Sequence, residues 1–356
     1  MCGDGVISST GAIHNGQKIL LVTKFRYLGD TIVATPVFRR LREALPDSVI
    51  TLLAGPAIPM LLQGNKYLTD IWGFDPKNPG GFRGNKNLVT RIKTHRFDAV
   101  ILLNRSLQSA IIAQAAGIPI RIGHDTEFRG PLLTHKVKYD WNKQDVECSF
   151  DLLRAVDIPG YICLPKLNVT EEEQESARDL LMAKGWSGKP IICIQPGAND
   201  PLIREWGADR YARTGDILAA ELGMQVVITG SGEELGSAKR TAQAMKSGPI
   251  LMAGETNLRQ ALGLISIASL WVGNDGGMLH AATALGTPSV GIFGPTKARR
   301  WGYDHAKHKS VTHIPGRPVP KAKAKAAAAI RTALDAITVE EVVAAAYEVL
   351  RTDRSE

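Results

Sequence analysis

The stretch KILLVTKFRYLGD, running from Lys18 to Asp30, indicates the fold class of this chain. Its first six residues are an apolar run that predicts a strand, and the residues from Tyr27 to Asp30 predict a turn. Apolar side chains at helical spacing follow over residues 31–45, and a second apolar run, VITLLA, follows over residues 49–54. A strand, a turn, a helix and another strand in this order predict a parallel sheet covered by helices.

The same alternation continues along the chain in two series. In the first half we expect further strands at 70–74, 99–103 and 120–123, and helices at 87–94 and 106–116, whereas the polar residues 124–144 are typical of a surface loop near a cleft. In the second half we expect strands at 191–195, 225–229, 250–252, 270–273 and 289–293, and helices near 208–222, 233–246, 257–267 and 277–285. The two series predict two doubly wound α/β domains of similar size.

The boundary between these domains is expected in the stretch from Asp157 to Asn168, which carries two prolines and a glycine. Directly after it, Thr170 and Glu173 have the spacing of a capping box, which predicts a helix start. We therefore expect a flexible leader over 1–17, an N-terminal domain over 18–160 and a C-terminal domain over 161–335. A helical segment over 336–356 could dock across the two domains.

Composition excludes several classes of protein. The chain has 356 residues, of which 44% are hydrophobic and 22% charged, so it is neither disordered nor collagen-like. No apolar stretch approaches the ~20 residues of a membrane span, and residues 1–17 do not have the pattern of a secretory signal. The four cysteines form no C-x-x-C pair, which fits a reducing cytoplasm better than a disulfide framework or a zinc site.

The net charge of +8 is concentrated in the first half of the chain. Residues 1–160 carry 20 Lys and Arg against 14 Asp and Glu, a net charge of +6, and the remainder carries +2. Such a surplus favours an acidic partner, namely nucleic acid, anionic lipid or a phosphorylated substrate, although solubility alone would also explain it. An aromatic content of 6% gives little support to nucleic acid.

Three loops stand where a predicted strand ends and a helix begins, which is where open α/β sheets bind ligands. In the first, Gly29 permits a tight turn and Asp30 is either a helix N-cap or a general base for a hydroxyl. In the second, a Pro-Gly turn exposes backbone N–H groups, and Arg204 is either a phosphate ligand or a solvated side chain. The residues of this second loop that we expect at a phosphate are Gly197, Ala198 and Asn199.

The third loop is the most specific of the three. Gly276 and Gly277 stand at a strand–helix junction, where free N–H groups can cradle a diphosphate. His280 follows in the first helical turn, where it could bond a phosphate oxygen or could instead be an ordinary interior histidine. We favour phosphate binding at this loop.

Weaker signals lie elsewhere in the C-terminal half. The stretch GSGEELG from Gly230 resembles a dinucleotide fingerprint whose last glycine comes one residue late, and Glu233 or Glu234 could accept from ribose hydroxyls. His305, His308 and His313 stand among lysines, which favours a solvated loop over a metal site. No Walker loop, H-E-x-x-H or D-x-D occurs, so a diphosphate bound by this chain is expected to be neutralised without a metal ion.

Taken together and in order, the three loops resemble the ADP-heptose:lipopolysaccharide heptosyltransferases, glycosyltransferase family 9. The resemblance rests on KFRYLGD at Lys24–Asp30 with Thr35-Pro36, on Gln195–Asn199 with a basic residue before Trp206, and on NDGGMLH at Asn274–His280. It continues through ALGTP at Ala284–Pro288, FGPT at Phe293–Thr296, and Trp301-Gly302, and it covers about residues 18–350. The turn at Lys24 is most similar to the heptosyltransferase III branch. Gly276 departs from the Ser or Thr that is usual in the family, and Arg204 from the commoner Lys.

The resemblance implies a GT-B architecture, in which two Rossmann-like domains face a cleft with the acceptor on the N-terminal side and the nucleotide sugar on the C-terminal side. It implies an inverting, metal-independent transfer from ADP-heptose, a substrate rather than a cofactor, with Asp30 as the base. Arg204, His280 and the N–H groups of Gly276 and Gly277 would hold the diphosphate, and Asp275 would orient the donor sugar. Basic Lys24 and Arg26 would lie on the acceptor side, and Thr256 near the adenine.

The acceptor that the resemblance implies is the acidic lipid A–Kdo or heptose core at the anionic surface of the inner membrane. The enzyme would then be cytoplasmic and peripheral on that membrane, with no nucleic acid partner. Three alternatives stay open: a family member with another nucleotide sugar and acceptor, a non-catalytic relative that only binds nucleotide sugar, and a dinucleotide oxidoreductase. The last is disfavoured because no proper G-x-G-x-x-G follows the first strand.

Overall fold

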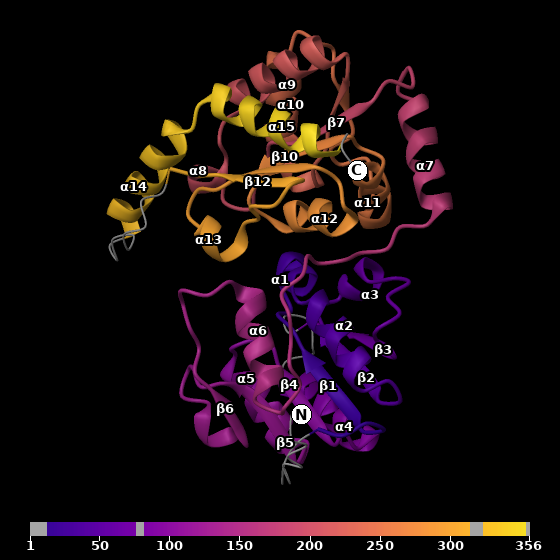
Figure 1. The fold of residues 1–356 in the computed structure, drawn as a ribbon, viewed down its shortest axis with the longest axis vertical. Helices are drawn as coiled ribbons and strands as arrows, with labels where there is room; N and C mark the ends of the chain where they lie inside the picture. The colour runs from indigo at the N-terminus through magenta and orange to yellow at the C-terminus, as the bar shows by residue number, and fades with distance from the viewer. Residues whose placement is uncertain (1–12, 76–81, 314–322, 354–356) are drawn as a thin grey trace, which may run out of the picture. The chain divides into compact units, whose positions relative to one another are not determined.

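The computed structural model describes residues 13–75, 82–313 and 323–353 and divides the chain into two compact units. Unit 1 comprises Met1–Pro59 and Asn65–Cys163, and unit 2 comprises Met60–Gly64 and Leu164–Glu356. Each unit holds a six-stranded sheet whose strand pairs are all parallel (Figure 1). In the described part of the chain, no helix has the length and apolar character that a membrane crossing requires.

The sheet of unit 1 has the strand order β3-β2-β1-β4-β5-β6. Its strands are β1 (Lys18–Val22), β2 (Val49–Ala54), β3 (Asp70–Gly73), β4 (Ala99–Leu102), β5 (Ile120–His124) and β6 (His135–Val137). The central strands are buried along almost their whole length, because helices cover both faces of a parallel sheet. The order reverses between β1 and β4, so the carboxyl ends of these two strands form the topological switch point of unit 1.

Helices of unit 1 pack in two layers, in which α2 contacts α6 and α4 contacts α5. The elements are α1 (Leu28–Val33), α2 (Thr35–Ala44), α3 (Ile58–Leu61, which crosses into unit 2), α4 (Phe82–His95), α5 (Leu107–Ala115), the 3-10 turn η1 (Gly130–Leu132) and α6 (Asp145–Arg154). The single helix expected over 31–45 is therefore two helices. Pro36 has no N–H to donate to the carbonyl of Ile32, and the hydroxyl of Thr35 donates to that carbonyl instead at 2.8 Å.

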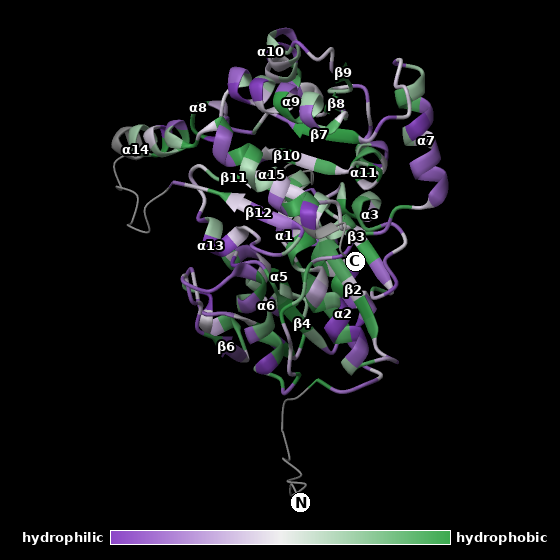
Figure 2. Ribbon diagram, turned by 45° about the horizontal axis from the view of Figure 1, so that its top comes forward, coloured by the Kyte–Doolittle hydropathy of each residue, from purple (hydrophilic) through white to green (hydrophobic). Residues whose placement is uncertain are grey.

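Unit 2 repeats the same winding, with the strand order β12-β11-β10-β7-β8-β9. Its strands are β7 (Ile191–Gln195), β8 (Gln225–Ile228), β9 (Ile250–Leu251), β10 (Leu270–Asn274), β11 (Ser289–Ile292) and β12 (His308–Val311). Figure 2 shows β7 as hydrophobic and much of α7 as hydrophilic, which is the expected contrast between a buried strand and a surface helix. The switch point of this unit lies at the carboxyl ends of β7 and β10.

The helices of unit 2 also cover both faces of their sheet. They are α7 (Glu171–Met182), α8 (Pro201–Arg204), α9 (Ala208–Leu222), the 3-10 turn η2 (Gly232–Glu234), α10 (Leu235–Ala244), α11 (Leu258–Ser266), α12 (Gly277–Leu285), α13 (Ala298–Trp301), α14 (Lys323–Ala336) and α15 (Val339–Asp353). The capping box of Thr170 and Glu173 starts α7 as expected. At the C-terminal end, α15 packs on α9 and buries Val342 and Ala346 in the core of unit 2.

The sequence patterns did not predict two strands of the structure, β6 and β12. Residues 124–144, expected to be an irregular loop, contain η1 and β6, and the histidine-rich region contains β12. Both strands lie at the edge of a sheet, and most of their residues are only partly buried. Edge strands of this kind carry polar and basic side chains, so they do not form the apolar runs by which central strands are found.

His308 is the clearest correction to the expected solvated loop. Its side chain is buried at 2% exposure, and its Nδ1 lies 3.0 Å from the hydroxyl of Ser289. His313 instead contacts Glu341 at 2.8 Å. Among the residues that the structure describes, no group of three or more His, Cys, Asp or Glu side chains could hold a metal ion.

Burial of His308 predicts a loss of stability in mild acid. Desolvation, aided by the charges of His305 and Lys307, lowers its pKa from 6.5 to about 4. Between these two pH values His308 is protonated in the unfolded chain and neutral in the folded chain. The free energy of unfolding therefore falls as the pH drops from 6.5 towards 4. Between pH 7 and pH 5 this histidine should cost at most about 2 kcal/mol of unfolding free energy. Urea unfolding at the two pH values should show a smaller difference in His308→Gln, and an unchanged difference would contradict the assignment.

Candidate functional site

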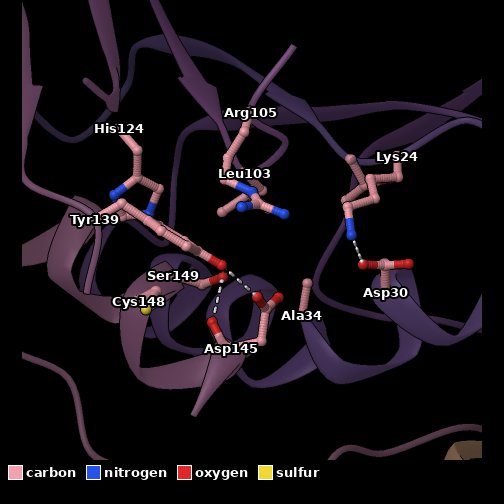
Figure 3. Close-up of a pocket in the computed structure, with 11 residues that line it drawn as sticks. Lys24, Asp30, Ala34, Leu103, Arg105, His124, Tyr139, Asp145, Cys148 and Ser149 are labelled. Atoms are coloured by element: carbon pink, nitrogen blue, oxygen red, sulfur yellow. Dashed lines mark hydrogen bonds and ion pairs between the residues drawn. The ribbon is translucent and has the colours of Figure 1, made fainter. Parts of the chain in front are cut away.

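A pocket lies at the switch point of unit 1, beside the carboxyl ends of β1 and β4. Its volume is about 380 Å³, which includes space that is open to solvent. Its polar lining comes from α1, the start of α6, the end of β5, and the segments that follow β1, β4 and β6 (Figure 3). The lining residues are Thr23, Lys24, Asp30, Ala34, Leu103, Arg105, His124, Tyr139, Asp145, Cys148 and Ser149.

Asp30 enters this pocket from α1, although not as the N-cap that the sequence suggested. Tyr27 is the N-cap residue and Asp30 the third residue of the helix. The carboxylate of Asp30 accepts a hydrogen bond from the ammonium group of Lys24, and its side chain is 14% exposed. The hydroxyl of Thr31 donates to that of Thr23 at 2.9 Å, which ties α1 to the end of β1. Asp30 is therefore a fixed carboxylate at the pocket wall.

Asp145, a second acid of the pocket, was not found by the sequence analysis. It is the first residue of α6, and the hydroxyl of Tyr139 donates to its Oδ1 at 3.0 Å. Burial raises the pKa of Asp145 to about 6, with Asp30 adding to the rise and Lys24 and Arg105 opposing it. The pocket therefore combines two carboxyl groups that lie in different environments.

Two buried basic side chains belong to the same region and were also missed. His124 is 2% exposed, its Nδ1 has no hydrogen-bond partner, and burial lowers its pKa to about 4. Arg129 is fully buried and donates to the carbonyl of His124 at 2.8 Å. Desolvation lowers the pKa of Arg129 to about 10, so it remains charged at neutral pH. The polar stretch 124–144 was expected near a cleft, but no motif singled out either residue within it.

In unit 2 the switch point is organised by Asn274 at the end of β10. Its amide nitrogen donates to the carbonyls of Pro196 and Gly197 at 2.8 and 3.2 Å. Its amide oxygen accepts from the backbone N–H of Trp206 at 3.2 Å and from the hydroxyl of Tyr211 at 2.9 Å. One buried amide thus joins the loop after β7 to the loop after β10, the two loops that the sequence analysis selected in this unit.

Asp275 and Arg204 meet at this junction. Nη1 of Arg204, at the end of α8, lies 3.5 Å from Oδ2 of Asp275, and the hydroxyl of Thr296 donates to the same oxygen. The carboxylate is only 8% exposed, whereas the guanidinium of Arg204 is 31% exposed. Arg204 is therefore held at one side and still accessible to a ligand.

The N-terminus of α12 follows directly. Gly276 is its N-cap residue in an extended conformation, with φ of −176°, and Gly277 begins the helix. His280 lies in the next turn, where its Nδ1 is 2.9 Å from the hydroxyl of Tyr303. Burial and the charge of Asp275 raise the pKa of Tyr303, so this hydroxyl keeps its proton. Backbone N–H groups, a histidine and a guanidinium thus stand at one switch point, an arrangement suited to oxygens of a phosphate.

The other residues that the sequence predicted for ligand binding make fewer contacts with these two switch points. Ala198 and Asn199 follow β7, and Glu233 is exposed in η2. Glu234 accepts from the backbone N–H of Ser231 at 2.7 Å and from Gln195 at 3.2 Å. A Cβ atom on Gly197 would lie 2.5 Å from the Cβ of Glu234, so that position requires glycine. Gly230 has a φ of +156°, Thr256 is half-buried before α11, and Arg26 is exposed and outside the pocket lining.

Two Rossmann-like units, each with polar side chains at its switch point, fit an enzyme of the GT-B-type fold. A model of glycosyltransferase family 9 (heptosyltransferase) matches residues 86–329. The chain belongs to this family and is a glycosyltransferase.

Curated relatives agree with this assignment. Lipopolysaccharide heptosyltransferase 2 of Escherichia coli K12 is 29% identical over 299 residues, which cover 79% of this chain and 83% of the relative. Lipopolysaccharide heptosyltransferase 3 of the same strain is 27% identical, covering 78% and 82%. The solved E. coli ADP-heptose lipopolysaccharide heptosyltransferase II has a TM-score of 0.76 and 24% identity, and the match covers 95% of this chain and 99% of that structure.

Proposed function

We propose that this glycosyltransferase moves a heptose from ADP-heptose to the inner core of lipopolysaccharide, with inversion at the anomeric carbon and without a bound metal ion. The observation that carries the proposal is the pair of switch points. One has a fixed carboxylate, Asp30, and the other has Arg204 and the N-terminus of α12. The relatives named heptosyltransferases 2 and 3 support the sugar and the acceptor, and the similarity to the solved ADP-heptose lipopolysaccharide heptosyltransferase II supports the donor.

In the proposed reaction, the carboxylate of Asp30 accepts the proton of an acceptor hydroxyl as that oxygen forms a bond to the anomeric carbon. The bond between this carbon and the diphosphate oxygen breaks, and its electron pair leaves with ADP. Arg204, the N–H groups at the start of α12 and His280 would stabilise the negative charge that develops on the leaving diphosphate. This role is the one that a divalent ion has in metal-dependent transferases.

The place of action follows from the acceptor in this proposal. A lipopolysaccharide core is anchored in the inner membrane, so the enzyme would work at the cytoplasmic face of that membrane as a peripheral protein. The net charge of +6 in residues 1–160 supports attraction to an anionic surface. The acceptor would then bind to unit 1 and the nucleotide sugar to unit 2.

A donor panel tests the proposal directly. Purified protein is mixed with ADP-heptose, ADP-glucose, UDP-glucose and GDP-mannose, and the melting temperature is followed. ADP-heptose should give the largest shift, and transfer to a truncated lipopolysaccharide core should proceed in EDTA with inverted product stereochemistry by NMR. Efficient transfer from another nucleotide sugar, or retention of configuration, would overturn the assignment. Binding without transfer to any core acceptor would favour a non-catalytic relative.

Gly276 lacks the side-chain hydroxyl of the Ser or Thr that is usual at this position in the family. A substitution that restores this hydroxyl tests whether its loss affects donor binding. A Cβ at this position would find its nearest neighbour, the carbonyl oxygen of Asn274, at 3.9 Å, so a serine fits. We expect Gly276→Ser to leave the melting temperature unchanged or slightly raised, since serine is a better N-cap residue. The new hydroxyl should lower the KM for the donor by about 2- to 10-fold, the effect of one hydrogen bond.

Gly273 provides the matched control for this prediction. A Cβ there would lie 2.6 Å from the ring of Trp271 and 2.9 Å from the carbonyl oxygen of Gln195. Gly273→Ala should therefore lower the unfolding free energy by about 1–3 kcal/mol through overpacking. Thermal melts and donor kinetics of both variants check the pair, and a destabilised Gly276→Ser variant would contradict the open space inferred at that site.

A further inference from the structure

Arg105 is a pocket residue to which neither the sequence nor the proposed chemistry gives a role. It follows β4 and therefore lies at the switch point, where it lines the same pocket as Asp30. Its guanidinium carbon is 4.6 Å from the ring centre of Tyr139 and 4.5 Å from that of Trp141. The two rings are nearly perpendicular, at 83°. The guanidinium therefore sits in a corner of two aromatic faces (Figure 3 shows Arg105 and Tyr139).

Lys24 and Asp145, two other ionisable side chains of the pocket, already have partners within it. The ammonium group of Lys24 bonds to Asp30, and Asp145 accepts from Tyr139. Within the described ranges, Arg105 has no hydrogen bond and no carboxylate at ion-pair distance. Stacking leaves the N–H groups at the edge of the guanidinium plane, so this arginine is held in place while its donors stay available.

Two further observations point to a negatively charged ligand. Buried Arg129 brings a second positive charge close to the pocket, since its Nη1 lies 3.4 Å from the carbonyl oxygen of Ser106, the residue after Arg105. His124 lines the pocket with a buried Nδ1 that has no partner. A planar, fixed guanidinium binds two oxygens of a carboxylate or phosphate through parallel hydrogen bonds.

We propose that Arg105 binds an anionic group of the acceptor, a carboxylate or a phosphate, and thereby determines which acidic sugars present a hydroxyl to Asp30. The inference rests on the proposed function in one respect, that unit 1 holds the acceptor. It adds to the acceptor-side roles expected for Lys24, which is bonded to the base itself, and for Arg26, which is exposed outside the pocket. Arg105 is thus a specificity-determining residue, and the acceptor class is a polyhydroxylated sugar with an acidic group near the accepting hydroxyl.

Kinetics with matched acceptors test the proposal. Core acceptors are compared in three forms: intact, with sugar carboxylates reduced to alcohols, and dephosphorylated. Arg105→Gln should raise the KM for the intact acceptor by about 10- to 100-fold, the effect of a lost charge-assisted pair, with kcat changed less than about threefold. It should have no effect on the KM for the form that lacks the recognised group, which identifies that group as carboxylate or phosphate. Arg105→Lys should recover part of the lost affinity.

Arg91 offers a matched control variant. Its guanidinium carbon lies 3.8 Å from the ring centre of Trp72, so it is also an arginine stacked on an indole in unit 1, but it lies outside the pocket lining. Arg91→Gln should leave the KM of every acceptor form unchanged. If Arg105→Gln raised the KM equally for charged and uncharged acceptors, the anion-binding role would be wrong.

A binding measurement separates this inference from the proposed function. A sugar carboxylate, a sugar phosphate and their neutral parent sugar are titrated into the protein while Trp fluorescence is followed. Trp141 should report binding because it stacks on Arg105, and Trp141→Phe identifies its part of the signal. Wild type should respond to one of the acidic sugars and Arg105→Gln should not, even if no heptose is ever transferred. Equal responses of wild type and Arg105→Gln, or no response of wild type to either acidic sugar, would overturn the inference.

Discussion

Replacing Asp30 by asparagine is expected to lower the kcat of transfer by about 10²- to 10⁴-fold, the usual contribution of a positioned general base. The amide is nearly isosteric with the carboxylate but cannot accept the hydroxyl proton. Because Asp30 lies in unit 1 and the donor is proposed to bind to unit 2, the affinity for ADP-heptose should change little. Steady-state kinetics and a calorimetric titration of the donor measure the two quantities separately.

Asp47 supplies the control for this experiment. It is an exposed acid of unit 1 that accepts from Asn15 at 2.7 Å and does not line the pocket. Asp47→Asn should keep the wild-type kcat. If Asp30→Asn also kept it, Asp30 would not be the base, and Asp145 would be the next carboxyl of the pocket to test. A loss of donor affinity equal to the loss of kcat would point to a structural role for Asp30.

A large effect on stability is expected at Arg259. This side chain is 9% exposed and donates to Glu173 at 2.6 Å and to the carbonyl of Asn168 at 2.9 Å. It also reaches the carbonyl of Leu61 at 3.5 Å, which helps explain why residues 60–64 belong to unit 2. Arg259→Gln leaves the Glu173 carboxylate, whose side chain is 20% exposed, without its cation and removes the bond to Asn168, so the unfolding free energy should fall by about 1–3 kcal/mol.

The acid limb of the stability curve provides a second readout for this pair. The hydrogen bond from Arg259 lowers the pKa of Glu173 below 4.5. Stability from this pair is therefore complete above that value and is lost as the pH falls through the lowered pKa of the folded state. Arg259→Gln should remove this part of the pH dependence and should speed hydrogen exchange in α7 and α11, the helices that the pair joins.

Arg213 is the matched control for the partly buried pair of Arg259 and Glu173. It forms an ion pair with Glu340 at 3.0 Å, but the two side chains are 66% and 65% exposed. Arg213→Gln should change the unfolding free energy by no more than about 0.5 kcal/mol, because solvent screens exposed pairs. Calorimetric melts of the two variants make the comparison. Equal effects at Arg213 and Arg259 would show that burial does not govern the strength of these pairs.

The fold could be predicted from the sequence to the extent that its strands are buried. Strands β1, β2, β4 and β7 are apolar along nearly their whole length, and each was found. β6 and β12 were missed because these edge strands are only partly buried and consist mostly of polar and basic residues. The break between α1 and α2 follows from the missing N–H of Pro36, a local cause that the helical pattern of residues 31–45 concealed.

The site was predictable only where the functional residues are neighbours in the sequence. Asp30, Arg204 and His280 stand in helices that begin directly after short loops at strand ends, and parallel strands bring such loops to one edge of a sheet. Arg105, His124 and Asp145 are single polar residues in separate segments, without a motif around them. They share a pocket because β4, β5 and β6 continue the sheet beyond β1, which puts the end of β5 and the segments that follow β4 and β6 beside Asp30.

The amino-acid order alone therefore determined the two wound domains, the family and the loops at the strand ends, since periodicity and short-range motifs are local properties of a chain. Which polar and charged side chains contact one another depends on the folded structure of each unit. Lys24 is bonded to Asp30, Asn274 joins two loops, and Arg105 lies against two rings because of contacts between residues far apart or on opposite sides of a turn. Burial then sets the pKa of Asp145 and His308, because desolvation depends on the surrounding atoms and not on sequence neighbours.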